Sequence, residues 1–232
     1  MTESEKYYME SLYPLQNGIL NIVGRLNLPF YLTGGTALSR HYFHHRYSDD
    51  LDLFINNDPM FGSYVDRIFS EFEVEERKGI FSIDRSTISK KEMYAQVFVV
   101  GIGNVRLKID LVNDIAAHYG ELVNDPLLMR VDSWRNILSN KIAALYRFEP
   151  KDVADIWMIS RSFKFSWKEI LHEAISKELA VDPIAAAEIL RGIPTAYLKT
   201  VKWTSQIDEA VFRSDIDAIA NDILKGTDNS LA

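Results

Sequence analysis

The chain has 232 residues, close to half of them apolar, which is enough for one large domain or two small ones. It contains no cysteine, which excludes disulfides, thiolate catalysis and cysteine-ligated zinc or iron–sulfur sites. Its net charge of −7 argues against a protein that coats nucleic acid with a broad basic surface, although a local basic groove remains compatible with it.

The first residues are polar and acidic, without the basic start and apolar stretch that are typical of a secretory signal. No apolar run approaches the ~20 residues that a membrane helix needs. We therefore expect a cytoplasmic protein without a membrane partner.

The first half of the chain mixes helical and strand patterns. Apolar residues recur at helical spacing over residues 13–26, Pro29 ends that pattern, and residues 30–32 predict a short strand. A turn at 33–36 precedes a helix predicted from Thr36 to His44. Further strands are expected at 51–55, 80–83, 95–100 and 105–112, with a helix at 65–72 and a hairpin loop at 101–104.

The second half is helical in character. Helices are predicted at 134–147, 151–160, 167–177, 183–191 and 207–224, and strand signals are nearly absent there. The pattern predicts an α+β protein, with a catalytic domain over residues 1–125 and a helical domain over residues 126–232.

The run Asp50-Leu51-Asp52-Leu53 carries the first candidate site. Side chains alternate along a strand, so Asp50 and Asp52 share one face while Leu51 and Leu53 point into the core. Two neighbouring carboxylates repel each other unless a divalent cation lies between them. The pattern therefore suggests a metal site, although Asp-x-Asp alone is more often a half-exposed strand or a turn.

The strand expected at 105–112 repeats this alternation. Its odd-numbered residues from Val105 to Leu111 are apolar, whereas Arg106, Lys108 and Asp110 form the polar face. If it pairs beside the first strand, Asp110 completes a cluster of three carboxylates. Such a cluster can hold two magnesium ions about 3.5–4 Å apart, which suits nucleotidyl transfer from an NTP.

Gly34, Gly35 and Thr36 lie between a short strand and a helix. Glycines let the backbone approach a phosphate, a helix N-terminus offers unpaired N–H groups, and Thr36 can cap the helix and donate its hydroxyl. Most such turns are tight connections only. Here the Asp-x-Asp strand follows at once, and a phosphate cradle beside a metal pair is what nucleotidyl transfer requires.

Together the runs Thr33-Gly-Gly-Thr-Ala-Leu-Ser39 and His45-Arg-Tyr-Ser-Asp-Asp-Leu-Asp-Leu-Phe54 resemble the AbiEii/AbiGii group of nucleotidyltransferase toxins, within the DNA polymerase β-like nucleotidyltransferase superfamily. Residues 141–147 and the run Lys151-Asp152-x-x-Asp155 resemble the downstream motif of that group. The resemblance spans most of residues 31–160, in order. It implies a polymerase β-like nucleotidyltransferase domain with a mixed sheet, followed by a helical domain.

The resemblance also implies roles for individual residues. Asp50 and Asp52 would bind magnesium, Asp110 would be the third carboxylate and general base, and Gly35 and Thr36 would contact NTP phosphates. The superfamily usually has Gly-Ser where this chain has Gly-Thr, and threonine keeps the hydroxyl. Members of the group are encoded with an antitoxin, and some modify the acceptor ends of tRNAs, so tRNA and a cognate antitoxin are expected partners.

Several charged residues outside the carboxylate cluster have two interpretations. Arg46 could contact a phosphate or form an ion pair with a nearby aspartate. Lys141 could reach a groove between the domains and bind nucleotide. Lys151 and Asp155 are spaced for a surface pair on a helix, but the resemblance favours Asp152 as a nucleotide contact and Lys151 as a nucleotide contact or general acid. For the cluster of His41, His44 and His45, a solvated or capping role is favoured over a metal site.

Four functions remain open from the sequence, the last of them a two-metal phosphohydrolase, which could use similar acids but has no need for the glycine turn. The leading one is metal-dependent transfer of NMP to an acceptor hydroxyl, as the toxin of a toxin–antitoxin or abortive-infection system. A small-molecule transferase of the antibiotic-modifying type would use the same carboxylates. A module of the same fold that only binds nucleotide or a partner is the third, and the intact set of carboxylates argues against it.

Overall fold

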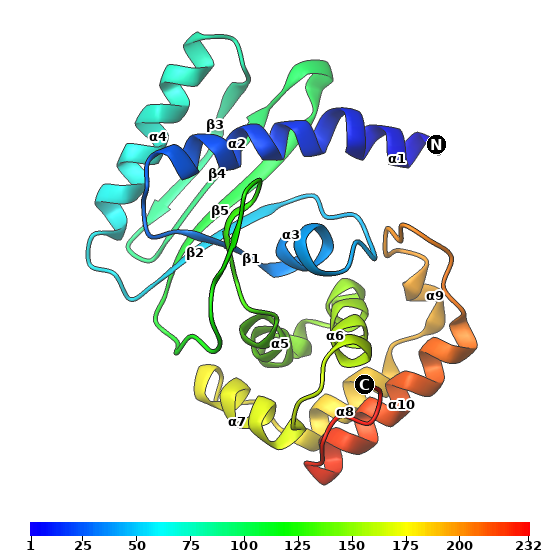
Figure 1. Ribbon diagram of the computed structural model, residues 1–232. Coiled ribbons are helices and arrows are strands. Elements are labelled where there is room, and N and C mark those ends of the chain that lie inside the picture. The colour runs from blue at the N-terminus through cyan, green and yellow to red at the C-terminus, as the bar shows by residue number, and fades with distance from the viewer. The chain divides into compact units, whose positions relative to one another are not determined.

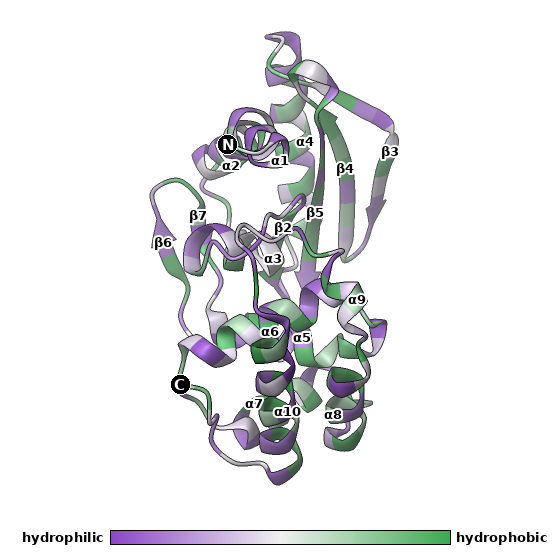
Figure 2. Cartoon of the chain, turned by 90° about the vertical axis from the view of Figure 1, so that its right-hand side faces the viewer, coloured by the Kyte–Doolittle hydropathy of each residue, from purple (hydrophilic) through white to green (hydrophobic).

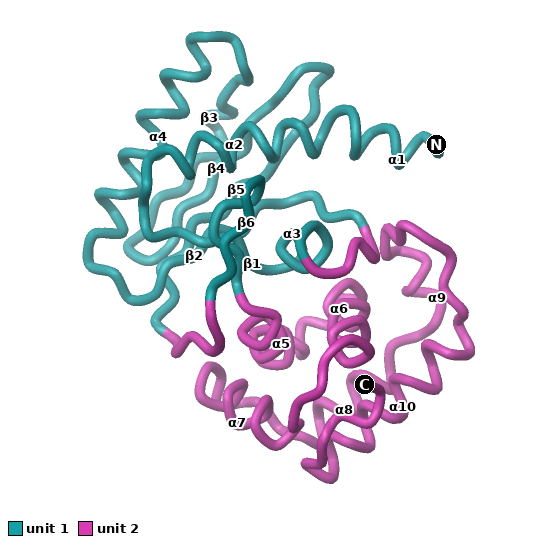
Figure 3. The backbone as a smooth tube through the Cα atoms, in the orientation of Figure 1, with its two compact units in different colours: residues 1–41, 47–115, 122–132 teal, residues 42–46, 116–121, 133–232 magenta.

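The computed structural model describes all 232 residues, and they form two compact units (Figure 3). Unit 1 comprises residues 1–41, 47–115 and 122–132, and unit 2 comprises residues 42–46, 116–121 and 133–232. The combination of a mixed sheet with helices confirms the α+β class. The domain boundary expected after residue 125 remains a prediction.

Unit 1 is built on a seven-stranded sheet in the order β3-β4-β5-β2-β1-β7-β6 (Figure 1). The central strand β2 runs parallel to β5 on one side and antiparallel to β1 on the other. β1 and β7 are parallel, and the remaining neighbours are antiparallel. The strands are β1 (Tyr31–Thr33), β2 (Leu51–Asn56), β3 (Ser82–Lys91), β4 (Tyr94–Val100), β5 (Arg106–Asp114), β6 (Val123–Asp125) and β7 (Met129–Val131).

One face of the central strands is apolar and buried. Alternate residues of β2 and β5, from Leu51 to Ile55 and from Leu107 to Leu111, are almost inaccessible to solvent. The helices α2 (Tyr13–Arg25) and α4 (Phe61–Arg77) lie over one side of the sheet (Figures 1 and 2). Because burial of apolar area drives this packing, the polar residues of the same strands are left on the opposite face.

The N-terminal helix begins earlier than the sequence pattern indicated. The chain is helical from α1 (Glu3–Tyr7) through a π-helical turn (Tyr8–Leu12) into α2. Pro14 follows that turn and has no N–H to donate to the preceding turn, so a regular hydrogen-bond ladder cannot run through this point.

The turn after β1 also differs from the prediction. Helix α3 (Gly34–Ala37) begins two residues before the expected start at Thr36 and continues as a π-helical turn (Leu38–Tyr42). Thr33, not Thr36, occupies the N-cap position. Thr36 therefore lies inside the helix, and the prediction that it caps the helix was wrong.

Unit 2 is helical, as expected, and its helices pack against one another around α5, α6 and α10 (Figure 1). They are α5 (Trp134–Ala143), α6 (Pro150–Ser162), α7 (Trp167–Lys177), α8 (Pro183–Gly192), α9 (Thr195–Leu198) and α10 (Glu209–Lys225). The single helix expected over 134–147 instead ends at Ala143, and a 3₁₀ turn (Leu145–Arg147) follows it. None of the helices combines the length and apolar character that a membrane crossing requires.

Candidate active site

Three carboxylates lie on the polar face at the centre of the sheet. Asp52 of β2 and Asp110 of β5 are register partners on adjacent parallel strands, so their side chains leave the sheet on the same side. Asp50 immediately precedes β2, two residues before Asp52, and its charge acts on Lys108 together with those of Asp52 and Asp110. The row continues outward, with Thr33 beside Asp52 and Gln96 beside Asp110.

Gly34 lets the backbone lie directly against Asp52. Its φ of +67° is in the left-handed region that favours glycine. A Cβ atom at this position would stand 2.5 Å from Oδ2 of Asp52, far inside van der Waals contact. Any other residue at position 34 would therefore displace the carboxylate as well as strain the turn.

The segment that carries Asp50 is held by contacts from three helical segments. The Thr36 hydroxyl donates a hydrogen bond to the backbone carbonyl of Asp50. The amide of Gln16 donates to the carbonyl of Ser48 at 3.1 Å, and the Tyr8 hydroxyl donates to Oδ1 of Asp49 at 2.5 Å. Burial and the adjacent Asp49 carboxylate raise the pKa of Tyr8, which keeps it a donor. These contacts fix the approach to β2 before any ligand binds.

Asp110 is held by two side chains of its own sheet. The Lys108 ammonium lies 2.7 Å from Oδ2 and the Tyr94 hydroxyl 2.9 Å from Oδ1. Burial alone would lower the pKa of Lys108, but Asp110, Asp50 and Asp52 outweigh it and raise that pKa. Burial, then Asp110 and Asp52, raise the pKa of Tyr94. The three carboxylates therefore act electrostatically on one lysine.

The chemistry of this donor set fits a hard divalent cation, because carboxylate oxygens are the ligands that magnesium prefers. As the side chains stand, however, no group of three His, Asp or Glu side chains in the chain is gathered closely enough to hold a metal ion. The Lys108 ammonium already occupies Oδ2 of Asp110. An incoming divalent ion would have to share this carboxylate with Lys108 or displace the lysine.

Arg46 and Lys141 belong to a buried charge cluster within unit 2. Its centre is Asp155, which is fully buried on α6. Arg46 donates to both of its carboxylate oxygens, at 2.7 and 2.6 Å, while Nε2 of His45 lies 2.7 Å from Oδ1 and Nζ of Lys141 2.7 Å from Oδ2. Burial alone would raise the pKa of Asp155, but it is outweighed by Arg46, Lys141 and His45, which hold that pKa well below its ordinary value.

These contacts correct three expectations. Arg46 pairs with Asp155, not with an aspartate next to it in the sequence. Asp155 is inside the helical unit and has no surface pair with Lys151, which is exposed on α6. His45 is not solvated: its side chain is only 4% exposed and it is bonded to Asp155. Each of these expectations failed because the actual partner is distant in the sequence.

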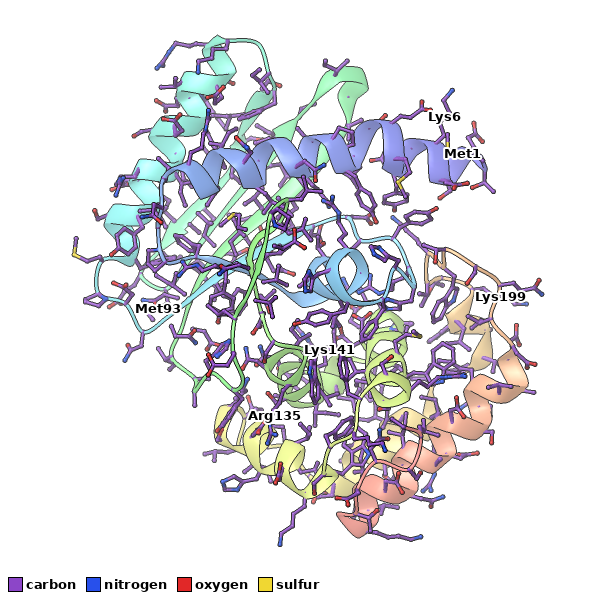
Figure 4. All side chains as sticks on the ribbon, in the orientation of Figure 1. Met1, Lys6, Met93, Arg135, Lys141 and Lys199 are labelled. Atoms are coloured by element: carbon purple, nitrogen blue, oxygen red, sulfur yellow. The ribbon has the colours of Figure 1, made fainter.

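Lys141 and Asp152 form a second ion pair in this cluster. The lysine, on α5 among the helices of unit 2 (Figure 4), lies 2.7 Å from Oδ1 of Asp152 and is itself almost wholly buried. Burial lowers the pKa of Lys141, but Asp152 and Asp155 outweigh it and raise that pKa. Arg147 approaches the other Asp152 oxygen at 3.8 Å. Lys141 is thus a fixed positive charge within its own unit.

Two kinds of residue were missed by the sequence analysis. Tyr94 and Gln96 lie on the polar face of β4, where they alternate with the buried residues Ala95 and Val97. This alternation was a usable signal, because it predicts that both side chains face the same way as Asp110 on the neighbouring strand β5. Tyr8 gave no such signal, since its contact with Asp49 spans 41 residues.

Solved structures of other proteins share this fold. The solved structures that resemble the chain include a candidate nucleotidyltransferase from Helicobacter pylori, with 17% identity, a TM-score of 0.62, and 91% of this chain and 94% of that one covered. Another is MenT4, a nucleotidyltransferase toxin from Mycobacterium tuberculosis, with 13% identity, a TM-score of 0.62, and 92% and 82% covered. At these identities the likeness shows a shared fold alone.

No curated protein matches the sequence. The family described as the nucleotidyl transferase AbiEii toxin of type IV toxin–antitoxin systems, in contrast, matches residues 22–229, which is nearly the whole chain. The resemblance noted from the glycine turn and the Asp-x-Asp strand is thereby confirmed. The chain belongs to the AbiEii family of nucleotidyltransferase toxins.

Proposed function

We propose that this nucleotidyltransferase moves an NMP from an NTP to an acceptor hydroxyl at Asp50, Asp52 and Asp110, with release of pyrophosphate. The observation that carries the proposal is the register of β2 and β5, which makes Asp52 and Asp110 neighbours on one face. Magnesium bound to these carboxylates, two ions in our proposal, would supply charge neutralisation for the triphosphate and activation of the acceptor oxygen.

Asp110 is the proposed general base. Tyr94 bonds Oδ1 and Lys108 bonds Oδ2, so the side chain of Asp110 is oriented before substrate binds. A base must lie within hydrogen-bond reach of the proton it takes, and a fixed carboxylate on a central strand satisfies this requirement better than one on a loop.

The nucleotide is proposed to lie along Gly34, Gly35 and Thr36. Gly34 supports this role because its missing side chain leaves the backbone and Asp52 in direct apposition. Thr36 already donates its hydroxyl to the Asp50 carbonyl, so a phosphate contact from Thr36 would require that bond to change. Its present role is to hold Asp50.

The charged residues of unit 2 that the resemblance singled out differ in their surroundings. Arg46 donates to both carboxylate oxygens of Asp155, which supports a structural role, whereas Lys141 and Asp152 remain proposed nucleotide contacts. Lys151 is exposed and has no ion pair shorter than 4.0 Å in the structure, which leaves its ammonium accessible as a proposed nucleotide contact or general acid.

The proposed acceptor is tRNA, and the proposed setting is the cytoplasm, where NTPs and tRNA are both available. A type IV toxin family implies a cognate antitoxin, which we propose for this chain as well. A small-molecule acceptor of the antibiotic type is the second candidate, because the same carboxylates would serve it.

The test is transfer of label from each α-labelled NTP to total RNA, with magnesium or with a chelator. We expect labelling by the wild type with magnesium only, and loss of at least about a hundredfold in Asp52→Asn and Asp110→Asn. Asp66→Asn is the matched control, since Asp66 is an exposed acid that pairs only with Lys90. Equal labelling by wild type and Asp52→Asn would refute the assignment. Labelling of an aminoglycoside instead of RNA would favour the second acceptor.

A further inference from the structure

Tyr94 brings a hydroxyl of the protein itself to the proposed general base. It lies on β4, whose neighbour β5 carries Asp110 (Figure 1), and its oxygen is 2.9 Å from Oδ1 of that carboxylate. This distance falls in the range of about 2.6–3.2 Å over which a general base can take a proton. An acceptor hydroxyl must stand in the same relation to Asp110, so Tyr94 already holds the position of an acceptor.

The sheet directs the ring of Tyr94 toward Asp110. Gln96 is the register partner of Asp110, and Tyr94 is two residues from Gln96 on the same face of β4. Diagonal neighbours on adjacent strands lie within reach of an aromatic side chain. Oε1 of Gln96 lies 2.8 Å from the same hydroxyl and adds a second polar contact. Two paired strands therefore set the position of this oxygen.

The hydroxyl of Tyr94 has one proton, and Asp110 is placed to receive it. An ionised carboxylate is a stronger hydrogen-bond acceptor than the amide oxygen of Gln96. Oδ2 of Asp110 is bonded to Lys108, which leaves Oδ1 for the proton. Asp52 also lies near enough to act electrostatically on Tyr94. The tyrosine oxygen thus stands beside two of the three carboxylates at which the proposed transfer takes place.

Two other hydroxyls near the carboxylates are engaged elsewhere. The Thr33 hydroxyl donates to Oδ2 of Asp132, and the Thr36 hydroxyl donates to the backbone carbonyl of Asp50. Neither threonine donates its proton to a carboxylate of the proposed site. Tyr94 differs from both in facing the base directly.

We propose that Tyr94 is nucleotidylated by its own active site when an NTP is bound and no other acceptor is present. The tyrosine oxygen attacks the α-phosphorus of the NTP while Asp110 takes the phenolic proton. The bond between that phosphorus and the bridging oxygen breaks, and pyrophosphate leaves with the electron pair. The product is an NMP–tyrosine phosphodiester. This inference rests on the proposed function, since it uses the same NTP and the same general base.

The test incubates the full chain with magnesium and each α-labelled NTP, without RNA, and locates the label by mass spectrometry of the peptides. We expect one NMP per chain, on Tyr94. Tyr94→Phe removes the acceptor oxygen, and its labelling should fall to the level of a chelator control. Tyr146→Phe is the matched control and should label as the wild type does, because Tyr146 is 61% exposed and has no carboxylate bonded to its hydroxyl.

The reaction should also be intramolecular, since Tyr94 is half-buried and bonded to its own Asp110. The labelling rate per chain should not change on dilution, and wild type should not label an equal amount of Asp52→Asn. Label on the exposed Tyr146 or Tyr197 in place of Tyr94 overturns the inference, as does labelling of Asp52→Asn by the wild type.

A parallel reaction with total RNA separates this inference from the proposed function. Labelling of RNA by a chain that never labels itself overturns the inference and leaves the proposed function standing. Self-labelling on Tyr94 without labelling of RNA supports the inference and refutes the RNA acceptor only. Absence of label from both the chain and the RNA refutes both.

Discussion

Replacing Gly34 with alanine tests whether the glycine turn serves Asp52. The new Cβ would be 2.5 Å from Oδ2 of Asp52, and ordinary contact begins near 3.4 Å. The carboxylate must therefore retreat by about 1 Å, and a misplacement of that size at a reacting centre can cost about a hundredfold in rate. The alanine must also hold a φ of +67°, which costs about 1–2 kcal/mol.

Gly79→Ala provides the matched control. Gly79 has a φ of +78°, and a Cβ atom there would meet nothing within 4 Å. Both variants should lose similar stability, which for a chain of this size is a fall in Tm of about 2–8 °C. Only Gly34→Ala should also lose transfer activity.

The assay combines thermal unfolding with label transfer from an α-labelled NTP at a temperature where both variants are folded. Nearly normal transfer by Gly34→Ala would show that the apposition of Gly34 and Asp52 is unimportant for the chemistry. A comparable loss in Gly79→Ala would show that backbone strain alone explains the effect.

Three further outcomes are expected. Lys108→Met should lower the magnesium concentration at half-maximal activity by up to about tenfold, because it removes a cation that competes for Asp110. The ion pair between Lys108 and Asp110 is part-exposed and contributes roughly 1 kcal/mol. An increase in that magnesium concentration would mean that Lys108 assists binding. Asp155→Asn should destabilise the fold by about 3–5 kcal/mol in urea unfolding, since it leaves buried cations unpaired, whereas the exposed Asp217→Asn should have little effect. Folding lowers the pKa of Asp155, so the stability that its carboxylate contributes is fully present above about pH 4 and is lost as pH falls through the folded-state pKa. The difference in unfolding free energy between wild type and Asp155→Asn should therefore shrink only below about pH 4.

The alternating strands were predictable because a sheet buried on one face imposes a period of two. Asp52 and Asp110 stood out between buried aliphatic residues, with Asp50 two residues before Asp52, and the observed pattern of burial along β2 and β5 follows that alternation. The three-residue strands β6 and β7 did not stand out, since they are too short for a period to be visible.

The ion pairs of unit 2 could not be predicted for a different reason. Asp155 and Arg46 are separated by 109 residues, and no local spacing indicates such a pair. Helix α6 is also buried at nearly every position from Asp152 to Trp157, so the helical period does not reveal which charged residue faces solvent. The charge at Asp155 suggested a surface position, and tertiary packing overrode that preference.

The short segment 42–46 has a consequence for dissecting this protein. It belongs to unit 2 but lies in the chain between two stretches of unit 1. A fragment starting at residue 133 would lack His45 and Arg46, and would leave Asp155 facing Lys141 as its only remaining cation of the cluster. The helical half should therefore fold poorly when expressed by itself, and recover when the preceding fragment is supplied in trans.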